Sequence, residues 1–157
     1  MAPKPLVLQY VPVNEHRETL GMPDVLDEYP VPAGRAMDGV LGFRMLSVDG
    51  DVAEAEVPIT DAVRQRFGVV HGGAYAAPAE MLATEATVQQ VWPDGNSAMG
   101  QSNATSFLRP VREGTVRARA RRVHAGRTTW VWNVDLTDDD ERLCAVSRVT
   151  IAVRPRS

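Results

Sequence analysis

The sequence lacks the features of secreted and membrane proteins. Of its 157 residues only Cys144 is a cysteine, which excludes an internal disulfide and suits the reducing cytoplasm. Every uncharged stretch is broken by Gly, Pro or polar residues well before membrane-spanning length. The N-terminal segment Met1–Pro5 also lacks the charged-then-apolar layout of a signal peptide. We therefore expect a cytoplasmic protein with no membrane partner, in which Cys144 is a buried small side chain.

An excess of basic charge is also missing. The formal net charge is −3, whereas nucleic-acid-binding domains are usually basic, so no nucleic-acid partner is expected. Arginine is dense only from Arg109 to Arg127, and this stretch could bind a phosphate-bearing small ligand. No spacing of His, Cys, Asp and Glu is typical of a metal site. We expect neither a metal nor a separate cofactor.

The length corresponds to one well-cored domain. Repeated prolines interrupt any periodic pattern near the start, which predicts a proline-rich N-terminal arm over residues 1–34. A short helix at 24–29 is a minor expectation within that arm. A single domain over 35–157 is expected to follow.

Strand-like and helical patterns alternate along this domain. A hairpin around Asp49-Gly50 and a short helical turn precede a long helix and four further strands. The expected ranges are 41–47 and 52–57 for the hairpin strands, 60–66 for the turn, 73–91 for the helix, and 98–107, 115–124, 128–136 and 143–153 for the later strands. This order predicts an α+β fold in which an antiparallel sheet packs on one long helix.

The long helix is apolar on nearly all sides. Between Gly73 and Val88 its only charged residues are Glu80 and Glu85. Because such a helix is buried on most sides, we expect a curved sheet to wrap around it. One chain would still leave a face of the helix open, which indicates a dimer.

The segment His71-Gly72-Gly73 directly precedes this helix. The first N–H groups of a helix have no intrahelical partners, and with the helix dipole they favour a developing negative charge. The glycines therefore indicate an oxyanion site, although they could simply form a tight loop. No serine or cysteine stands beside His71, so loop-shaping hydrogen bonds are favoured over direct proton transfer.

Glu80 lies further along the same helix. Most helical glutamates face solvent, but the neighbours of Glu80 on its helical face are small, and Thr84 places a hydroxyl at i+4. A carboxylate in a largely apolar place is costly unless it is paired or used. Its expected roles are nucleophile or general base.

Gly72 and Glu80 are eight residues apart, which is roughly 12 Å along a helix. A glutamate does not bridge that distance to a carbonyl bound at the Gly72 N–H of its own chain. We therefore hypothesise a composite site, with the oxyanion donor from one subunit and Glu80 and Thr84 from the other.

Several stretches resemble the hotdog-fold thioesterases of the phenylacetate-pathway type. The match is closest to the 4-hydroxybenzoyl-CoA thioesterases that carry a catalytic glutamate in the central helix. The resembling stretches are 64–75, 79–85, 100–103, 107–111 and 124–130. The resemblance covers roughly residues 35–156 and implies a hotdog fold, a sheet wrapped around one central helix, assembled as a dimer of dimers.

The resemblance also implies roles for individual residues. The Gly72 N–H polarises the thioester carbonyl, Glu80 acts as nucleophile or as base for water, and Thr84 positions the water. Gln65 contacts the thioester or its leaving thiolate, and His71 supports the loop. The implied reaction is hydrolysis of an aromatic acyl-CoA, 4-hydroxybenzoyl-CoA or a close relative. A broader aryl- or phenylacetyl-CoA thioesterase and a non-catalytic acyl-CoA-binding module are the alternatives.

Coenzyme A carries phosphates, which arginines bind well. We assign Arg109, the turn residues Arg127 and Thr128, and Gly73 to substrate binding. The arginines of 115–124 alternate with small residues and line one strand face, either solvated or in contact with ligand. In the resembling enzymes the position of Pro78 is usually aliphatic, and a bend there could alter the pocket.

Overall fold

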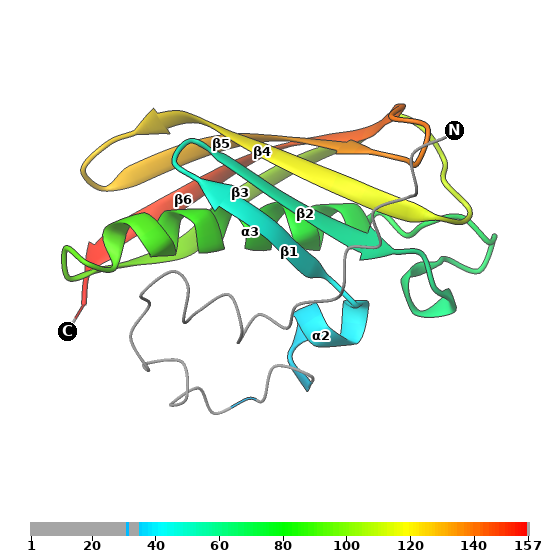
Figure 1. Ribbon diagram of the computed structural model, residues 1–157, viewed down its shortest axis with the longest axis horizontal. Helices are drawn as coiled ribbons and strands as arrows, with labels where there is room; N and C mark the ends of the chain where they lie inside the picture. The colour runs from blue at the N-terminus through cyan, green and yellow to red at the C-terminus, as the bar shows by residue number, and fades with distance from the viewer. Residues whose placement is uncertain (1–30, 32–34, 157) are drawn as a thin grey trace, which may run out of the picture. The chain divides into compact units, whose positions relative to one another are not determined.

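The computed structural model describes Val31 and residues 35–156. Backbone contacts separate the chain into residues 1–30 and 31–157. The expected arm over 1–34, Val31 apart, and the short helix at 24–29 lie outside the described residues. The elements of the second unit are α2 (Met37–Leu41), β1 (Arg44–Asp49), β2 (Val52–Pro58), a 3-10 turn (Asp61–Val63), α3 (Gly73–Val91), β3 (Asn96–Phe107), β4 (Thr115–Ala125), β5 (Thr129–Thr137) and β6 (Leu143–Pro155) (Figure 1).

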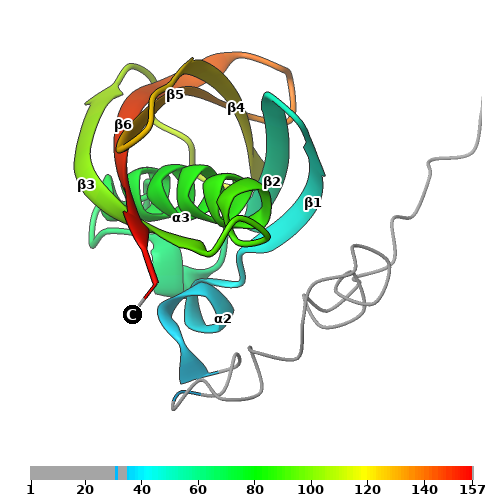
Figure 2. The same cartoon turned by 90° about the vertical axis from the view of Figure 1, so that its left-hand side faces the viewer.

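The six strands form one antiparallel sheet in the order β1-β2-β4-β5-β6-β3. The sheet curves around α3, as the view along the helix shows (Figure 2). This is the predicted α+β arrangement of a sheet wrapped around one helix. The strand that follows α3 crosses to the far edge of the sheet, so β1 and β3 are the two edge strands.

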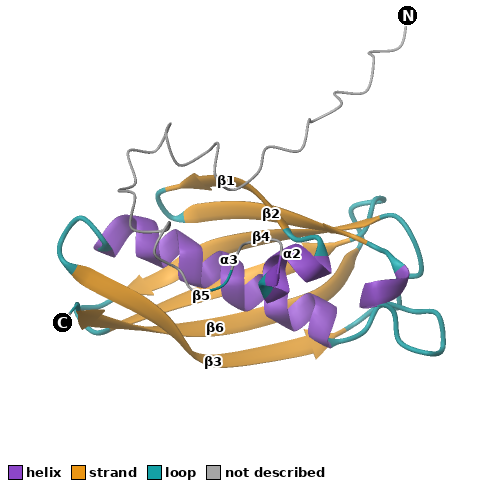
Figure 3. Cartoon of the chain, turned by 90° about the horizontal axis from the view of Figure 1, so that it is seen from below, coloured by secondary structure: helices purple, strands orange, loops and turns teal. Residues whose placement is uncertain are grey.

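The central helix buries one face against the sheet and leaves the other partly open (Figure 3). Small residues on the buried face let the helix lie close to the strands, and Leu82 is fully buried among them. The indole N–H of Trp132 on β5 donates to Thr87 Oγ1 at 2.9 Å, which ties the helix to the sheet. The half-buried face carries Ala76, Ala77, Glu80, Met81, Thr84 and Val88. An open face on a single chain was the expectation from the sequence.

Pro78 is accommodated inside α3. The helix is continuous from Gly73 to Val91, and Pro78 is fully buried within it. Proline lacks an N–H, so the bond to the Ala74 carbonyl is absent. Because this loss falls in the second turn, the rest of the helix retains its hydrogen bonds.

Two local predictions were wrong. Leu41 was expected to begin a strand, but it ends the five-residue helix α2, and β1 begins only at Arg44. Gly42 closes this helix in the left-handed conformation, with φ of 70°, which glycine adopts without strain. The helical turn expected over 60–66 spans only Asp61–Val63, because Arg64 is already extended and bridges to Val70.

Candidate active site

The loop before α3 is held in place by backbone hydrogen bonds. The Gln65 N–H donates to the Val69 carbonyl at 2.8 Å, and the His71 N–H donates to the Val63 carbonyl at 2.8 Å. These bonds place Gln65 and His71 on one compact loop that leads directly into the helix. Gln65 is half-buried and His71 is exposed.

Gly72 is the N-cap residue of α3 and already has helical dihedrals, with φ of −53° and ψ of −36°. The Gly73 N–H donates to His71 Nδ1 at 2.9 Å, so the imidazole occupies that donor. The Gly72 N–H makes no hydrogen bond to any other described residue. The helix start therefore presents one free donor at the positive end of the macrodipole, which is where an oxyanion is best stabilised.

The ring of Phe107, at the end of β3, lies directly against Gly72. A Cβ added at Gly72 would be 2.8 Å from Phe107 Cζ and 3.1 Å from its Cε2. Since the Gly72 dihedrals suit any residue, the requirement for glycine here comes from space. Phe107 also packs against Tyr75, with ring centroids 6.1 Å apart, yet 58% of Phe107 stays exposed.

Glu80 lies on the half-open face of α3. Thr84 Oγ1 donates to Glu80 Oε1 at 3.0 Å, which holds the carboxylate toward the next turn of the helix. The backbone of Gly100 on β3 lies beside the same oxygen, and a Cβ at that position would be 2.0 Å from it. The carboxylate is therefore held between a hydroxyl and a strand backbone.

The predicted site residues fall into two groups. Gln65, His71 and Gly72 lie at the Phe107 end of β3, whereas Glu80 and Thr84 lie at the Gly100 position. The α3 helix is continuous between them, so eight residues separate Gly72 and Glu80 by roughly 12 Å. One chain does not bring the predicted oxyanion donor, the Gly72 N–H, and the Glu80 carboxylate together.

Sequence comparison decides the family. Residues 67–145 match the model of the thioesterase superfamily. The chain belongs to the thioesterase superfamily. It is a thioester hydrolase, and the predicted hotdog fold is confirmed.

Three relatives illustrate the similarity. A 1,4-dihydroxy-2-naphthoyl-CoA hydrolase of Listeria monocytogenes is 33% identical over 74% of this chain and 94% of its own length. The structure of a thioesterase from Haemophilus influenzae has a TM-score of 0.73 and 34% identity, covering 76% of this chain and 83% of that one. A Staphylococcus aureus thioesterase, solved once with a glutamine and once with a glutamate replaced by alanine, covers 76–77% of this chain and 98–100% of its own. Its TM-scores are 0.73 and 0.74, at 25% and 26% identity.

The residues assigned to CoA binding in this thioesterase lie level with the two groups along the sheet. Arg109 follows Phe107 by two positions, at the Gly72 end of β3, and Gly73 begins α3. Thr129, next to Arg127 and Thr128, is in register with Ala152 of β6, which also pairs with Met99 of β3. The turn is thus level with the Gly100 end. Arg109, Arg127 and Thr128 are exposed, and neither arginine forms an ion pair within 35–156.

The arginines of β4 lie on the outer face of the sheet and are paired there. Arg117 contacts Asp139 at 3.1 Å, Arg119 contacts Glu54 at 3.4 Å, and Arg121 contacts Asp135 at 3.1 Å. This arrangement supports the solvated-face interpretation over ligand contact.

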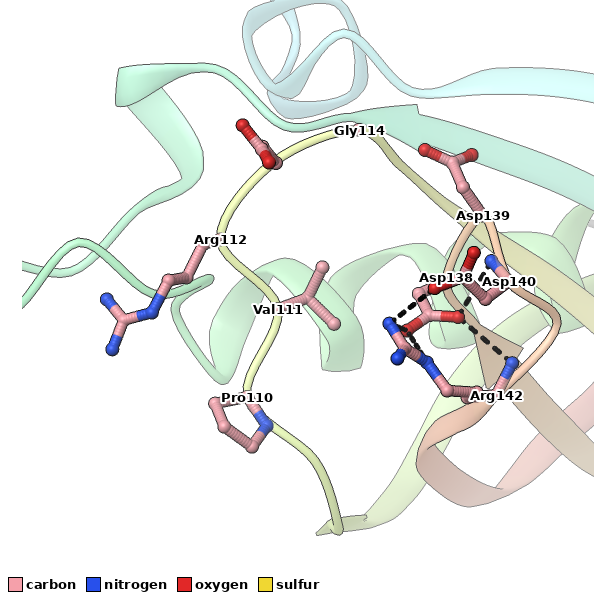
Figure 4. A pocket seen from close by; sticks show the side chains of 9 residues that line it. Pro110, Val111, Arg112, Gly114, Asp138, Asp139, Asp140 and Arg142 are labelled. Atoms are coloured by element: carbon pink, nitrogen blue, oxygen red, sulfur yellow. Dashed lines mark hydrogen bonds and ion pairs between the residues drawn. The ribbon is translucent and has the colours of Figure 1, made fainter.

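A hollow of about 330 Å³ lies between the loop 110–114 and the β5–β6 turn (Figure 4). Asp138 Oδ2 accepts a hydrogen bond from Arg142 Nε at 2.8 Å, and Asp138 Oδ1 accepts from the Arg142 N–H at 2.9 Å. The Arg142 side chain lowers the pKa of Asp138. Arg142 pairs with both Asp138 and Asp140, and the hollow holds none of the predicted site residues, so we interpret it as a feature of the hairpin.

Sequence reasoning missed Gly100, Phe107 and Tyr75 as neighbours of the site. Tyr75 is buried in the first turn of α3, and its hydroxyl makes no hydrogen bond to another described side chain. Burial first, and then the charges of Cys144 and Asp138, raise the pKa of Tyr75 to about 12. A signal existed for Gly100, because glycine within a strand often marks the close approach of another group.

Two further findings concern partners. No helix over the described residues is long and apolar enough to cross a membrane. Within the same residues no group of three His, Cys, Asp or Glu side chains is arranged to hold a metal ion.

Proposed function

We propose that this thioester hydrolase cleaves an aromatic acyl-CoA, 4-hydroxybenzoyl-CoA or a close relative, into the free acid and CoA. We further propose that each site is shared between two subunits. The observation that carries the proposal is that Gly72 and Glu80 lie against different points of the same exposed edge strand, β3. Gly72 lies against Phe107, and Glu80 lies against Gly100. Each chain would then supply the oxyanion donor to one site and the carboxylate to another.

The chemistry follows from the two groups. The thioester carbonyl oxygen accepts a hydrogen bond from the Gly72 N–H, and the dipole of α3 stabilises the negative charge that develops there. Glu80 either attacks the carbonyl carbon, forming a mixed anhydride that water then hydrolyses, or takes a proton from the attacking water. In both routes the C–S bond breaks and CoA leaves as its thiolate, near the Gln65 amide. Thr84 holds Glu80 by its hydrogen bond.

The exposed edge supports a homodimer. Residues 99–104 of β3 are exposed, and no further strand pairs with β3 on its outer side. Such an edge strand presents unpaired N–H and C=O groups to another strand. Antiparallel pairing of two β3 strands about a twofold axis places the Phe107 end of one copy beside the Gly100 half of the other. This pairing brings Gly72 of one subunit toward Glu80 of its partner. A dimer of dimers is the larger assembly that we propose.

The relatives support both the residues and the acyl class. The glutamine and the glutamate replaced in the Staphylococcus aureus thioesterase are fifteen positions apart, as Gln65 and Glu80 are here. The Listeria relative is named for a hydroxylated aromatic acyl-CoA. The half-open face of α3 offers small and apolar side chains beside Glu80, which suit a flat apolar ring.

A thiol-release assay tests the proposal. The wild-type protein should cleave 4-hydroxybenzoyl-CoA and benzoyl-CoA more efficiently than medium-chain acyl-CoA, with kcat/KM as the measure. Equal efficiency with phenylacetyl-CoA would favour the broader aryl thioesterase, and a preference for medium chains would refute the aromatic assignment. Glu80→Ala should lower kcat by at least ~10²-fold, the typical effect of losing one strong transition-state contact. A Glu80→Ala protein with near-normal turnover would refute the assignment of the carboxylate.

A further inference from the structure

The carboxylate of Glu80 occupies the space that a side chain on β3 would fill. An added Cβ at Gly100 would lie 2.0 Å from Glu80 Oε1, 2.9 Å from Cδ and 3.2 Å from Cγ. Gly100 is not among the glycines with positive φ, so its backbone conformation does not require glycine. The three atoms nearest to the added Cβ all belong to Glu80, so this side chain accounts for the lack of one at position 100.

The strand also changes its geometry at this point. Gly100 pairs with Ile151 of β6, and Ser102 pairs with Thr150, so Gln101 is an extra residue on β3. A β-bulge of this kind bends the strand and interrupts the alternation of its side chains. The irregularity begins at the residue that lies beside Glu80. The neighbouring β3 side chains are thereby directed differently from those of a regular strand.

We infer that Gly100 is a positioning residue for Glu80, an inference that rests on the proposed catalytic role of that carboxylate. Oε1 is the atom that accepts the Thr84 hydroxyl at 3.0 Å and also the atom nearest to Gly100. The hydroxyl and the strand backbone fix this oxygen from two sides. A group that displaces Oε1 from Gly100 therefore moves the same atom that accepts the Thr84 hydroxyl.

Gly100→Ala is the first test. The obstructing atoms belong to the end of a half-exposed side chain, so the chain should fold and assemble while the carboxylate moves. We expect kcat to fall about 10²-fold, the usual effect of a misplacement near 1 Å, with KM changed less than about threefold. Ser47→Ala, an exposed position on the opposite edge strand β1, is the control and should keep wild-type kcat and oligomer size. Wild-type kcat in Gly100→Ala would overturn the inference.

A double-mutant cycle separates positioning from a general defect of the strand. Glu80→Asp withdraws the carboxylate by one methylene and relieves the contact with a Cβ at position 100. Gly100→Ala should therefore lower kcat about 10²-fold in the wild-type background but less than about threefold in the Glu80→Asp background. Equal fold losses in the two backgrounds would overturn the inference.

A stability cycle gives a readout that does not depend on activity. Any decrease in melting temperature caused by Gly100→Ala should disappear when Glu80→Ala is also present, because the contact is then gone. An undiminished decrease would show that position 100 contacts something else and would overturn the inference. A fully active Glu80→Ala protein would instead refute the proposed function, so the two failures are distinguishable.

Discussion

Complementation between two inactive chains is the most direct consequence of the split between Gly72 and Glu80. One chain carries Gly72→Ala and the other Glu80→Ala, with different affinity tags. A Cβ at position 72 would lie 2.8 Å from Phe107 Cζ. Because the ring also packs against Tyr75, we expect the Gly72 loop to move and its N–H to shift. The helical dihedrals of Gly72 tolerate alanine, so this chain should still fold.

The expected kcat of the heterodimer differs widely between shared sites and sites contained within single chains. Losing one oxyanion donor typically costs ~2.7–4 kcal/mol in the barrier, a ~10²–10³-fold loss of kcat, and each homodimer should fall at least that far. In the heterodimer, a shared arrangement combines an intact Gly72 with an intact Glu80 at one of its two sites. About half the wild-type kcat per dimer should return. Sites contained within single chains would each keep one defect and stay near ~1% or less.

The assay is thiol release by heterodimers isolated with both tags in succession. A wild-type and Glu80→Ala heterodimer is the control, since it also contains one intact shared site and should give about half activity. Repeating the tag capture after the assay shows whether subunits have exchanged. Activity no higher than that of the two homodimers, in a heterodimer that is folded and intact, would refute the shared site.

Three further predictions follow from single contacts. Thr84→Val removes the 3.0 Å hydrogen bond to Glu80 and should lower kcat by about tenfold, since hydrogen bonds to charged groups contribute ~1.5–3 kcal/mol; unchanged steady-state kcat would contradict this role. Arg119→Gln breaks an exposed pair with Glu54, so urea titration should show a change below ~1 kcal/mol, and KM should be unaffected. Burial raises the pKa of Tyr75 to about 12, against an ordinary 10.0. Its contribution to the stability of the fold is therefore fully present below pH 10 and is lost as pH rises toward 12, because the unfolded chain ionises first. Tyr75→Phe should reduce the loss of stability between pH 9 and pH 11 in urea titrations, and an identical loss in both proteins would contradict it.

Local sequence signals predicted most of the fold. The Asp49-Gly50 turn lies between two strands as expected, and the helix begins at Gly73 and ends at Val91 as expected, because these boundaries depend on neighbouring residues. The five-residue helix α2 was missed because it is too short to show a helical period. The range of β3 was predicted to within two residues, but its place at the sheet edge depends on pairing with β6, which lies far along the chain.

The difference between local signals and long-range contacts also explains which parts of the candidate site were predicted. His71, Gly72, Glu80 and Thr84 lie on one loop and one helix, so their relation can be calculated from the rise of a helix. Gly100 and Phe107 come from another element, and their contacts with α3 depend on how the strand crosses the helix. A glycine inside a strand indicates close approach by some group, but the sequence does not say by which one.

Strand β3 provides a reason why both halves of the site contain glycine. At Gly72 the helix has no side chain because a ring of β3 lies there, and at Gly100 the strand has no side chain because a carboxylate of the helix lies there. In each case one element lacks a side chain at the point where a group of the other element lies. Neither glycine adopts a conformation that requires glycine. The two contacts fix α3 against β3 at both positions where the proposed chemistry takes place. Because β3 is also the exposed edge, pairing with a second copy would carry this alignment across the dimer, so the distance between Gly72 of one subunit and Glu80 of the other would depend on the same strand.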